Sequence, residues 1–404
     1  MNINSIRNDF PILGTQVNGK PLIYLDSGAT AQKPERVIES VNRLHREQNA
    51  NIHRGVHRLS EQATELYEQA RERVRGFIGA EQREEVIFTA GATASINTVA
   101  YAWSEKFLHE GDNIVISEME HHSNIVPWQL MAERRGAEIR VLPFDDAGRL
   151  MVEQLDRLLD DKTRMVAVTQ ASNTLGTRPD LQTIISKAHA AGAHVLVDGC
   201  QGVVHGGVDV KALDCDFYAF SGHKLYAPTG IGVLYGKREI LEQMPPFLCG
   251  GDMVDRVSFA KTTYAPLPLK YEAGTANFIG AIGLGEAIEY LKALDLKAVE
   301  EYERELTRYA EEQLQKIDGL RIYGTTEDKC SIISFNVEGV HHYDLGMILD
   351  KLGIAVRTGQ HCAEPVMAHY GITGMCRASI AMYNTREEMD ALYRGVERAV
   401  RMLR

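Results

Sequence analysis

An aspartate and a lysine follow two successive apolar runs of this chain. Asp198 comes directly after residues 194–197, and Lys224 comes shortly after residues 217–220. Adjacent strands of a parallel sheet bring the residues after them to one edge. A lysine that can form a Schiff base and a carboxylate that pairs with a pyridine nitrogen are what pyridoxal phosphate requires. Each residue alone is more often merely solvated, but the pair predicts a site for this cofactor.

A glycine-led segment supplies a candidate phosphate cradle. Gly91, Ala92 and Thr93 follow a predicted strand at residues 85–89 and open a helical pattern. Backbone N–H groups at a helix N-terminus, together with hydroxyl groups, suit a phosphate. The signal is weak alone, because such residues mark any turn between strand and helix. Ser221 and His223 flank the lysine and are predicted to complete the cradle.

Two consecutive histidines, His121 and His122, follow the apolar run 113–117. Adjacent residues cannot easily share one tetrahedral zinc ion, and no HExxH or CxxC pattern supplies further ligands, so no metal site is predicted. A flat imidazole over the pyridine ring that can move protons is chemically more useful. We therefore expect a catalytic role for a histidine of this pair.

A cysteine lies far along the chain, within residues 357–363. Cys362 stands in a polar, glycine-containing loop near basic residues, a setting that could favour the thiolate, whereas Cys215 and Cys376 lie in apolar runs and are expected to pack. Arg377 begins a strand-like run at residues 378–382. An arginine fixed on a strand can bind a carboxylate through two parallel hydrogen bonds.

Short apolar runs alternate with stretches long enough for helices, such as residues 128–135 and 181–191. This pattern predicts an α/β fold with an open, mostly parallel sheet that binds ligands beyond the carboxyl ends of its strands. Long helical patterns from Gly280 onward predict a second domain, and Thr385 with Glu388 predicts a capping box for the last helix. Residues 244–270, with four prolines, are predicted to form an extended loop. The remaining predicted strands are residues 165–169 and 232–235.

Composition limits the possible partners and compartments. The net charge of -11 indicates no excess of basic residues with which to bind nucleic acid. Six cysteines in 404 residues, without a CxxC pair, favour reduced thiols. No apolar run approaches the length of a membrane span, and the N-terminal residues do not form a signal peptide. We expect a cytoplasmic protein that binds neither nucleic acid nor membrane.

Together these segments resemble the SufS-type cysteine desulfurases, a group within the class V aminotransferases that includes selenocysteine lyase-like enzymes. The matching segments, spread in order from Tyr24 to Ala363, are residues 24–29, 53–57, 119–128, 172–177, 198–201, 221–226, 272–275 and 357–363. The resemblance implies the type I, aspartate aminotransferase-like fold of pyridoxal-phosphate enzymes. It implies a large cofactor domain at residues 19–289, a smaller α+β domain at residues 1–18 and 290–404 that carries the cysteine loop, and a homodimer.

The resemblance also implies a role for each matched residue. Lys224 would carry the cofactor, His121 would stack on its ring, Asp198 would pair with the pyridine nitrogen and Gln201 would approach the phenolic oxygen. The phosphate of the cofactor would be held by Ala92, Thr93, Ser221, His223 and the partner subunit's Thr275. Cys362 would receive the sulfur, Asn173 would contact cofactor and substrate, and the other substrate-binding residues would be Ala29, His53, Arg357 and Arg377.

The implied activity is the conversion of L-cysteine to L-alanine, with the sulfur passed as a persulfide to an acceptor protein for iron–sulfur cluster assembly. A selenocysteine lyase, or another aminotransferase or lyase that needs no thiol, remains the alternative. Gln360, Ala92, Ala94 and Ala276 depart from common family residues, but none removes a group that does chemistry. Tyr343 stands where members with zinc-containing acceptors have histidine, so we predict a SufE-like acceptor. A phenol is a poorer zinc ligand than neutral imidazole.

Overall fold

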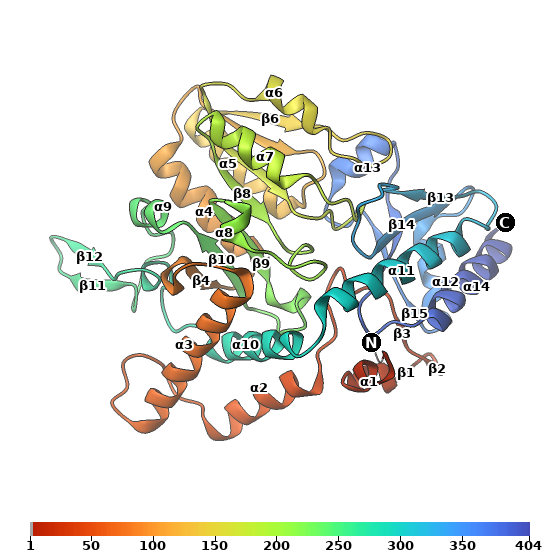
Figure 1. Cartoon of the computed structure of the whole chain (residues 1–404), viewed down its shortest axis with the longest axis horizontal. Helices are drawn as coiled ribbons and strands as arrows, with labels where there is room; N and C mark the ends of the chain where they lie inside the picture. The colour runs from red at the N-terminus through yellow and green to blue at the C-terminus, as the bar shows by residue number, and fades with distance from the viewer. Residues whose placement is uncertain (1–2) are drawn as a thin grey trace.

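A seven-stranded sheet forms the centre of the computed structural model, which describes residues 3–404 (Figure 1). Its strand order is β4-β10-β9-β8-β7-β5-β6. Strand β10 is antiparallel to both of its neighbours, while the pairs from β9 to β6 are parallel, so the predicted mostly parallel sheet is confirmed. The strands are β4 (Val86–Thr89), β5 (Asn113–Ser117), β6 (Glu138–Leu142), β7 (Thr163–Thr169), β8 (His194–Asp198), β9 (Phe217–Ser221) and β10 (Gly232–Gly236).

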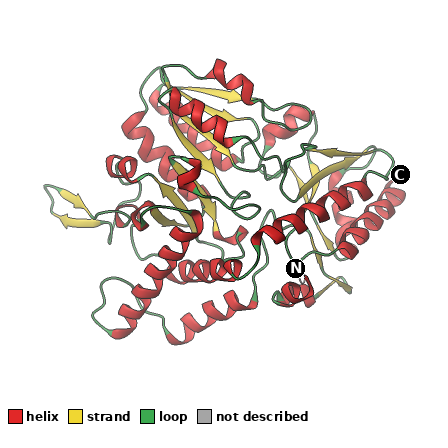
Figure 2. Ribbon diagram, viewed as in Figure 1, coloured by secondary structure: helices red, strands yellow, loops and turns green. Residues whose placement is uncertain are grey.

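Both faces of this sheet are buried. Along β7, Val166 and Val168 enter one hydrophobic core, while Met165 and Ala167 enter the other, as the two-residue period of a strand requires. Helices lie on both sides of the sheet (Figure 2). The first core contains residues of α3 (Arg58–Ile78), α7 (Leu181–Ala190) and α10 (Phe278–Lys292), and the second contains residues of α4 (Ala92–Phe107) and α5 (Val126–Arg135).

The C-terminal part of the chain forms a second sheet, antiparallel throughout, in the order β13-β14-β17-β16. Helices α11, α12 and α14 pack in a separate core with this sheet. The predicted capping box of the last helix is confirmed by reciprocal contacts of Thr385 and Glu388. These elements are α11 (Leu296–Leu314), β13 (Leu320–Tyr323), β14 (Ile332–Val337), α12 (His342–Lys351), β16 (Arg357–Gly359), β17 (Met375–Ser379) and α14 (Arg386–Leu403).

The N-terminal arm packs with this C-terminal part. Strand β3 (Ile23–Tyr24) pairs in parallel with β15 (Ile354–Ala355), and Asp26 bridges to Ser379. The arm therefore stays with the C-terminal part beyond residue 18, and the predicted domain division itself remains a prediction. Its other elements are α1 (Ile3–Asn8), η1 (Pro11–Gly14), β1 (Gln16–Val17), β2 (Lys20–Pro21) and, leading to the large sheet, α2 (Glu35–Glu47).

Residues 244–270 were predicted to form an extended loop. This prediction was partly wrong, because the segment contains a hairpin that projects from the body (Figure 1). It consists of β11 (Val254–Val257) and β12 (Thr262–Tyr264). Within the described residues, no helix is both long and apolar enough to span a membrane. The remaining short elements are η2 (Arg83–Glu85), η3 (His122–Asn124), η4 (Val152–Gln154), α6 (Leu155–Leu158), α8 (Val210–Leu213), η5 (Gly222–Lys224), α9 (Arg238–Gln243), η6 (Leu269–Tyr271) and α13 (Glu364–Tyr370).

Candidate active site

A cavity of about 210 Å³ lies beyond the carboxyl ends of the large sheet, between that sheet and residues of the N-terminal arm and β16. Ten of the predicted site residues line it: Ala29, Ala92, Thr93, His121, Asn173, Asp198, Ser221, His223, Lys224 and Arg357. Gly28, Ser123 and Cys200 complete the lining. The rule that places ligands at this edge of a parallel sheet is met here.

The carboxylate and the lysine come from neighbouring parallel strands. Asp198 is the last residue of β8 and pairs in register with Ala219 of β9. After β9, the 3₁₀ turn η5 carries Lys224 to the same edge of the sheet. Asp198 is buried, and its Oδ1 accepts the N–H of Cys200 at 3.0 Å, which fixes the orientation of the carboxylate. A pyridinium nitrogen would find a fixed, buried partner here.

The cradle at the start of α4 has the chemistry that a phosphate requires. The backbone N–H of Ala92 donates to Ser221 Oγ at 2.8 Å, and the first-turn N–H groups of α4 have no carbonyl partner within the helix. Gly91 has a φ of 151°, and a Cβ built on it would lie 3.3 Å from Ser221 Oγ. The glycine thus keeps the cradle open. Burial and the nearby Lys224 lower the pKa of His223 to about 4.

His121 is held as a neutral ring against the cavity. Its Nδ1 accepts the backbone N–H of Ser123 at 3.1 Å and lies 2.8 Å from the Ser123 hydroxyl oxygen. Burial, followed by the charge of Lys224, lowers the pKa of His121 to about 4. A neutral, oriented imidazole can stack on an aromatic ring and move a proton through Nε2.

Lys33 is a residue of this site that the sequence analysis missed. Its Nζ donates to the carbonyl of Ala31, to Thr30 Oγ1 at 3.3 Å and to the carbonyl of His223 at 3.2 Å. The His223 carbonyl also accepts the backbone N–H of Ala31 and the hydroxyl of Thr30. Burial lowers the pKa of Lys33 to about 8. The arm thus fixes the peptide unit that carries Lys224.

The cysteine loop lies at the rim of the cavity. Cys362 is half-buried and does not line the cavity, but Arg357, which does, donates from Nη2 to Cys362 Sγ at 3.7 Å. Asn173 Nδ2 donates to the carbonyl of His361 at 2.8 Å. Gln201 does not line the cavity either. It lies behind the cavity wall, where its Nε2 donates to the Gly28 carbonyl. The substrate-facing wall and the loop are therefore physically connected.

Arg377 is fully buried behind the cavity wall rather than exposed on it. Its Nη1 donates to the Asn173 carbonyl at 2.8 Å and its Nη2 lies 3.0 Å from Asp26 Oδ1, while Nε has no hydrogen-bond partner among the described residues. Burial lowers the pKa of Arg377 and raises that of Asp26. A Cβ on Gly28 would come within 3.4 Å of the guanidinium carbon, so this glycine leaves the approach to Arg377 open.

Besides Cys362, Gln201 and Arg377, two further predicted residues lie outside the cavity of their own chain. His53 and Thr275 are both exposed. The centroids of the His53 and Tyr67 rings are 5.7 Å apart. Thr275 lies three residues after Glu272, whose Oε1 forms a buried ion pair with Arg71 Nη1 at 2.6 Å. Their predicted roles in a partner's site or in substrate binding remain predictions.

A buried acid, Glu120, lies beneath the cavity and was also missed. Its carboxyl group accepts from the backbone N–H of Thr169 at 2.7 Å, from Asn124 Nδ2 at 2.7 Å and from the Ser117 hydroxyl. Complete burial outweighs these donors and raises the pKa of Glu120 to about 8. In the sequence, the neighbouring histidines indicated a catalytic role, whereas nothing indicated a role for Glu120.

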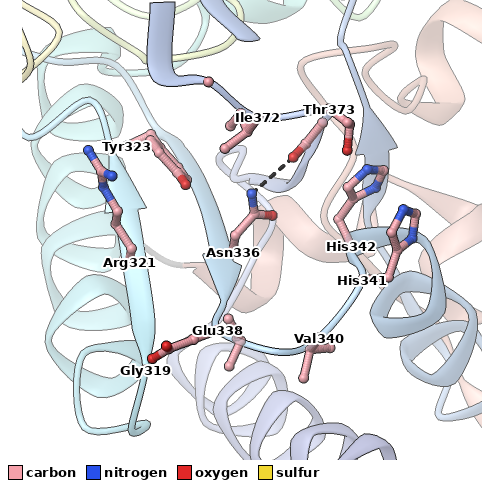
Figure 3. Close-up of a pocket in the computed structure, with 13 residues that line it drawn as sticks. Gly319, Arg321, Tyr323, Asn336, Glu338, Val340, His341, His342, Ile372 and Thr373 are labelled. Carbon is pink, nitrogen blue, oxygen red and sulfur yellow. Dashed lines mark hydrogen bonds between the residues drawn. The ribbon is translucent and has the colours of Figure 1, made fainter. Parts of the chain in front are cut away.

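A second, shallower cavity of about 430 Å³ lies at the N-terminus of α12 and contains none of the predicted site residues. Arg321 and Tyr323 lie on one side and His341 and His342 on the other, with Asn336 between them (Figure 3). The two imidazole centroids are 4.3 Å apart. In residues 3–404 we find no group of three or more His, Cys, Asp or Glu side chains arranged to hold a metal ion.

Comparison with known proteins places the chain among its relatives. The family model described as aminotransferase class-V matches residues 23–392. A cysteine desulfurase of Enterobacter sp. (strain 638) is 52% identical over 402 residues, which are 99% of both chains. The crystal structure of the Escherichia coli cysteine desulfurase CsdA, in an S-sulfonic acid form, superposes with a TM-score of 0.94 at 44% identity, and 100% of each chain is covered.

A structure of the apo cysteine desulfurase from Thermococcus onnurineus NA1 also gives a TM-score of 0.94, at 37% identity over 99% of this chain and 98% of that one. The sequence likeness and the fold likeness both extend over essentially the whole length. The chain therefore belongs to the pyridoxal-phosphate-dependent aminotransferase class-V family and, within it, to the cysteine desulfurases.

Proposed function

We propose that this enzyme converts L-cysteine to L-alanine and takes up the released sulfur as a persulfide on Cys362, with pyridoxal phosphate bound to Lys224. One observation carries the proposal. The cavity that contains Lys224 and Asp198 is also lined by Arg357, whose guanidinium donates to Cys362 Sγ at 3.7 Å. A Schiff-base lysine and a thiol thus serve the same small cavity.

The residues that line the cavity, with Gln201 behind its wall, fit the cofactor. Asp198 would pair with the ring nitrogen, His121 would stack on the ring and Gln201 would lie near its phenolic oxygen. The phosphate would be held by the α4 N-terminus with Ala92, Thr93, Ser221 and His223. When bound, pyridoxal phosphate supplies an electron sink that makes the Cα proton of an amino acid acidic.

The chain's own groups then bind substrate and move protons and sulfur. Arg377 and Arg357 would hold the substrate carboxylate, with Asn173 and Ala29 near it. Lys224 would take the Cα proton, and His121, neutral at physiological pH, would move protons in the same space. The Cys362 thiolate would attack the substrate sulfur, so that an S–S bond forms as the C–S bond breaks. After protonation, the carbon fragment would leave as L-alanine.

We also propose a homodimer in which Thr275, and with it the exposed His53, serves the site of the other subunit. Two features support this arrangement. Both residues are exposed on their own chain and lie outside its cavity. The hairpin of β11 and β12 carries Val257 and Phe259, apolar side chains that are exposed in the single chain. Exposed apolar groups of this kind favour burial against another surface.

For the sulfur acceptor we propose a SufE-like protein rather than a zinc-containing one, in the context of iron–sulfur cluster assembly. Tyr343 is 57% exposed at the start of α12, where zinc-using relatives have a histidine. His341 Nδ1 accepts the N–H of Tyr343 and caps this helix, which leaves only the other ring nitrogen of His341 for a metal. The His342 Nδ1 is buried. This arrangement supports thiol exchange between the Cys362 persulfide and a cysteine of the acceptor.

The decisive test is incubation of the purified holoenzyme with L-cysteine and a reductant, followed by measurement of alanine and sulfide in the same sample. We expect equal amounts of the two products. Formation of a keto acid without sulfide would identify an aminotransferase instead. If the unmodified enzyme released selenide from selenocysteine but little sulfide from cysteine, the alternative of a selenocysteine lyase would replace our proposal.

A further inference from the structure

The backbone of the cysteine loop adopts a conformation that side-chain-bearing residues disfavour. His361 and Cys362 have φ angles of 55° and 57°, two successive left-handed residues that are not glycine. Such residues persist where surrounding contacts hold them. Contacts from outside the loop must therefore keep Cys362 in this position.

Two of the contacts come from a single residue, His122. Its backbone N–H donates to the Cys362 carbonyl at 2.8 Å, and its ring Nε2 accepts the backbone N–H of Glu364 at 3.1 Å. His122 thus binds the chain on both sides of Ala363. On the other side of the thiol, Asn173 Nδ2 holds the His361 carbonyl.

The contact with Glu364 replaces a missing helix cap. Glu364 is the first residue of α13, Ala363 at the N-cap position has no side chain that can accept a hydrogen bond, and Pro365 has no N–H. First-turn N–H groups of a helix need an outside acceptor. The His122 imidazole provides it from a segment far away in the sequence.

The two adjacent histidines therefore have different roles. His121 faces the cavity and uses Nδ1 to bind Ser123, whereas His122 faces the cysteine loop and uses Nε2 as an acceptor. We infer that His122 is a positioning residue, whose ring Nε2 holds the Cys362 loop closed over the active site by capping α13. The inference rests on the proposed role of Cys362 as sulfur carrier. Release of this contact would let the loop open so that the persulfide can be passed on.

A matched pair of variants tests the role of Nε2. In His122→Gln, the amide oxygen can occupy the place of Nε2, while in His122→Asn the same amide is one methylene shorter and cannot reach Glu364. The backbone bond from residue 122 to Cys362 remains in both. The measurement is hydrogen exchange of residues 360–367 in the cofactor-bound enzyme, with the rate of alkylation of Cys362 by iodoacetamide as a second readout.

We expect the Glu364 amide to be protected in the unmodified enzyme. In His122→Asn, the exchange rate of this amide and the alkylation rate of Cys362 should both rise about fivefold, the factor that corresponds to the loss of one hydrogen bond. His122→Gln should stay within about twofold of the original protein. Exchange in β8 and the visible absorbance of the bound cofactor should remain unchanged in both variants, which separates loop opening from general unfolding.

Three results would overturn the inference: an unprotected Glu364 amide in the original enzyme, equal exchange in the Gln and Asn variants, or faster exchange without faster alkylation. The proposed function fails on a different experiment. Persistent sulfur release by Cys362→Ser would refute the role of the thiol, whatever the exchange data say about His122.

Discussion

The Nη2 of Arg377 lies 3.0 Å from Oδ1 of Asp26 and joins β17 to the N-terminal arm within a buried site. This ion pair orients the guanidinium, and the free Nε–H remains available close to Gly28 on the cavity wall. An arginine fixed in this way can serve both the fold and the substrate.

We predict that Arg377→Ala weakens binding of L-cysteine by about thirtyfold or more, equivalent to about 2 kcal/mol, because a carboxylate loses its charged partner in a partly desolvated site. Arg377→Lys should recover only part of the loss, since a point charge lacks the forked geometry. The apparent affinity comes from initial rates over a range of cysteine concentrations, with Arg357→Ala as the comparison. If only Arg357→Ala raised the KM, Arg357 would be the carboxylate ligand.

Lys224→Ala should abolish both cofactor linkage and turnover. The control is Lys33→Met, which removes the other lysine amine near this turn. Lys33 already donates to three oxygens and does not line the cavity, so the variant should keep the visible absorbance of a lysine-bound cofactor. Absorbance spectra and cofactor release on denaturation measure both variants. Linkage retained in Lys224→Ala would refute the assignment.

Cys362→Ser should bind cofactor and L-cysteine yet transfer no sulfur, because the thiol acts only after the Cα proton has been removed. Cys200 is the instructive comparison, since it lines the same cavity but burial raises its pKa to about 12. The thiolate is the nucleophile, so a thiol of this kind is inert at neutral pH. Mass spectrometry after one turnover should locate the persulfide on Cys362. A persulfide on Cys200 would contradict the prediction.

The stability of the protein should depend on pH through Glu120. Its folded pKa of about 8 lies above the ordinary 4.5, so the folded protein holds a proton that the unfolded chain releases between these values. The contribution of Glu120 to stability is therefore complete below about pH 4.5 and is lost as the pH rises through about 8, by at most ~1.4 kcal/mol per pH unit.

Glu120→Gln should flatten the fall in the free energy of unfolding between about pH 6 and about pH 9, as measured by urea denaturation. Glu118→Gln is the matched control, because it makes the same substitution at a nearby carboxylate whose side chain is partly exposed. An equal slope in Glu120→Gln and the original protein would show that Glu120 is ionised in the fold.

Desulfurase activity should rise when a SufE-like acceptor is added and stay flat with a zinc-containing acceptor. The reason is the phenol of Tyr343, because a phenol must lose its proton before it can bind zinc and is a poorer zinc ligand than neutral imidazole. Alanine formation with and without each acceptor measures the effect. Stimulation by the zinc-containing acceptor alone, and its loss on substitution of His341 or His342, would reverse this prediction.

The sequence predicted those parts of the site that follow buried strands. Asp198 and Lys224 were found because β8 and β9 are apolar runs with chemistry-bearing residues directly after them. The edge strand β6 was missed because most of its residues are at least partly exposed and no continuous apolar run marks it. The hairpin of β11 and β12 was missed because prolines and exposed residues surround it.

Residues that act through backbone groups left no signal. Lys33 binds carbonyl oxygens of its own segment and of η5, and His122 binds a carbonyl and an amide of the distant cysteine loop. Backbone groups look the same at every position of a sequence, so a side chain that recognises them cannot be identified by its spacing from other side chains. Only the fold brings the two together.

The pairing of β3 with β15 has a consequence for the order of events during synthesis. The N-terminal arm is made before the large sheet, whereas its partner strand and the Arg377 that binds Asp26 are made after that sheet. The large sheet can form before then, because its strands lie between Val86 and Gly236 and domains fold as the chain emerges. We expect Gly28 and Ala29 to reach their places on the cavity wall only after β15 and Arg377 have been made. A chain that ended before Arg377 would therefore lack a finished site, even though its large sheet could already have formed.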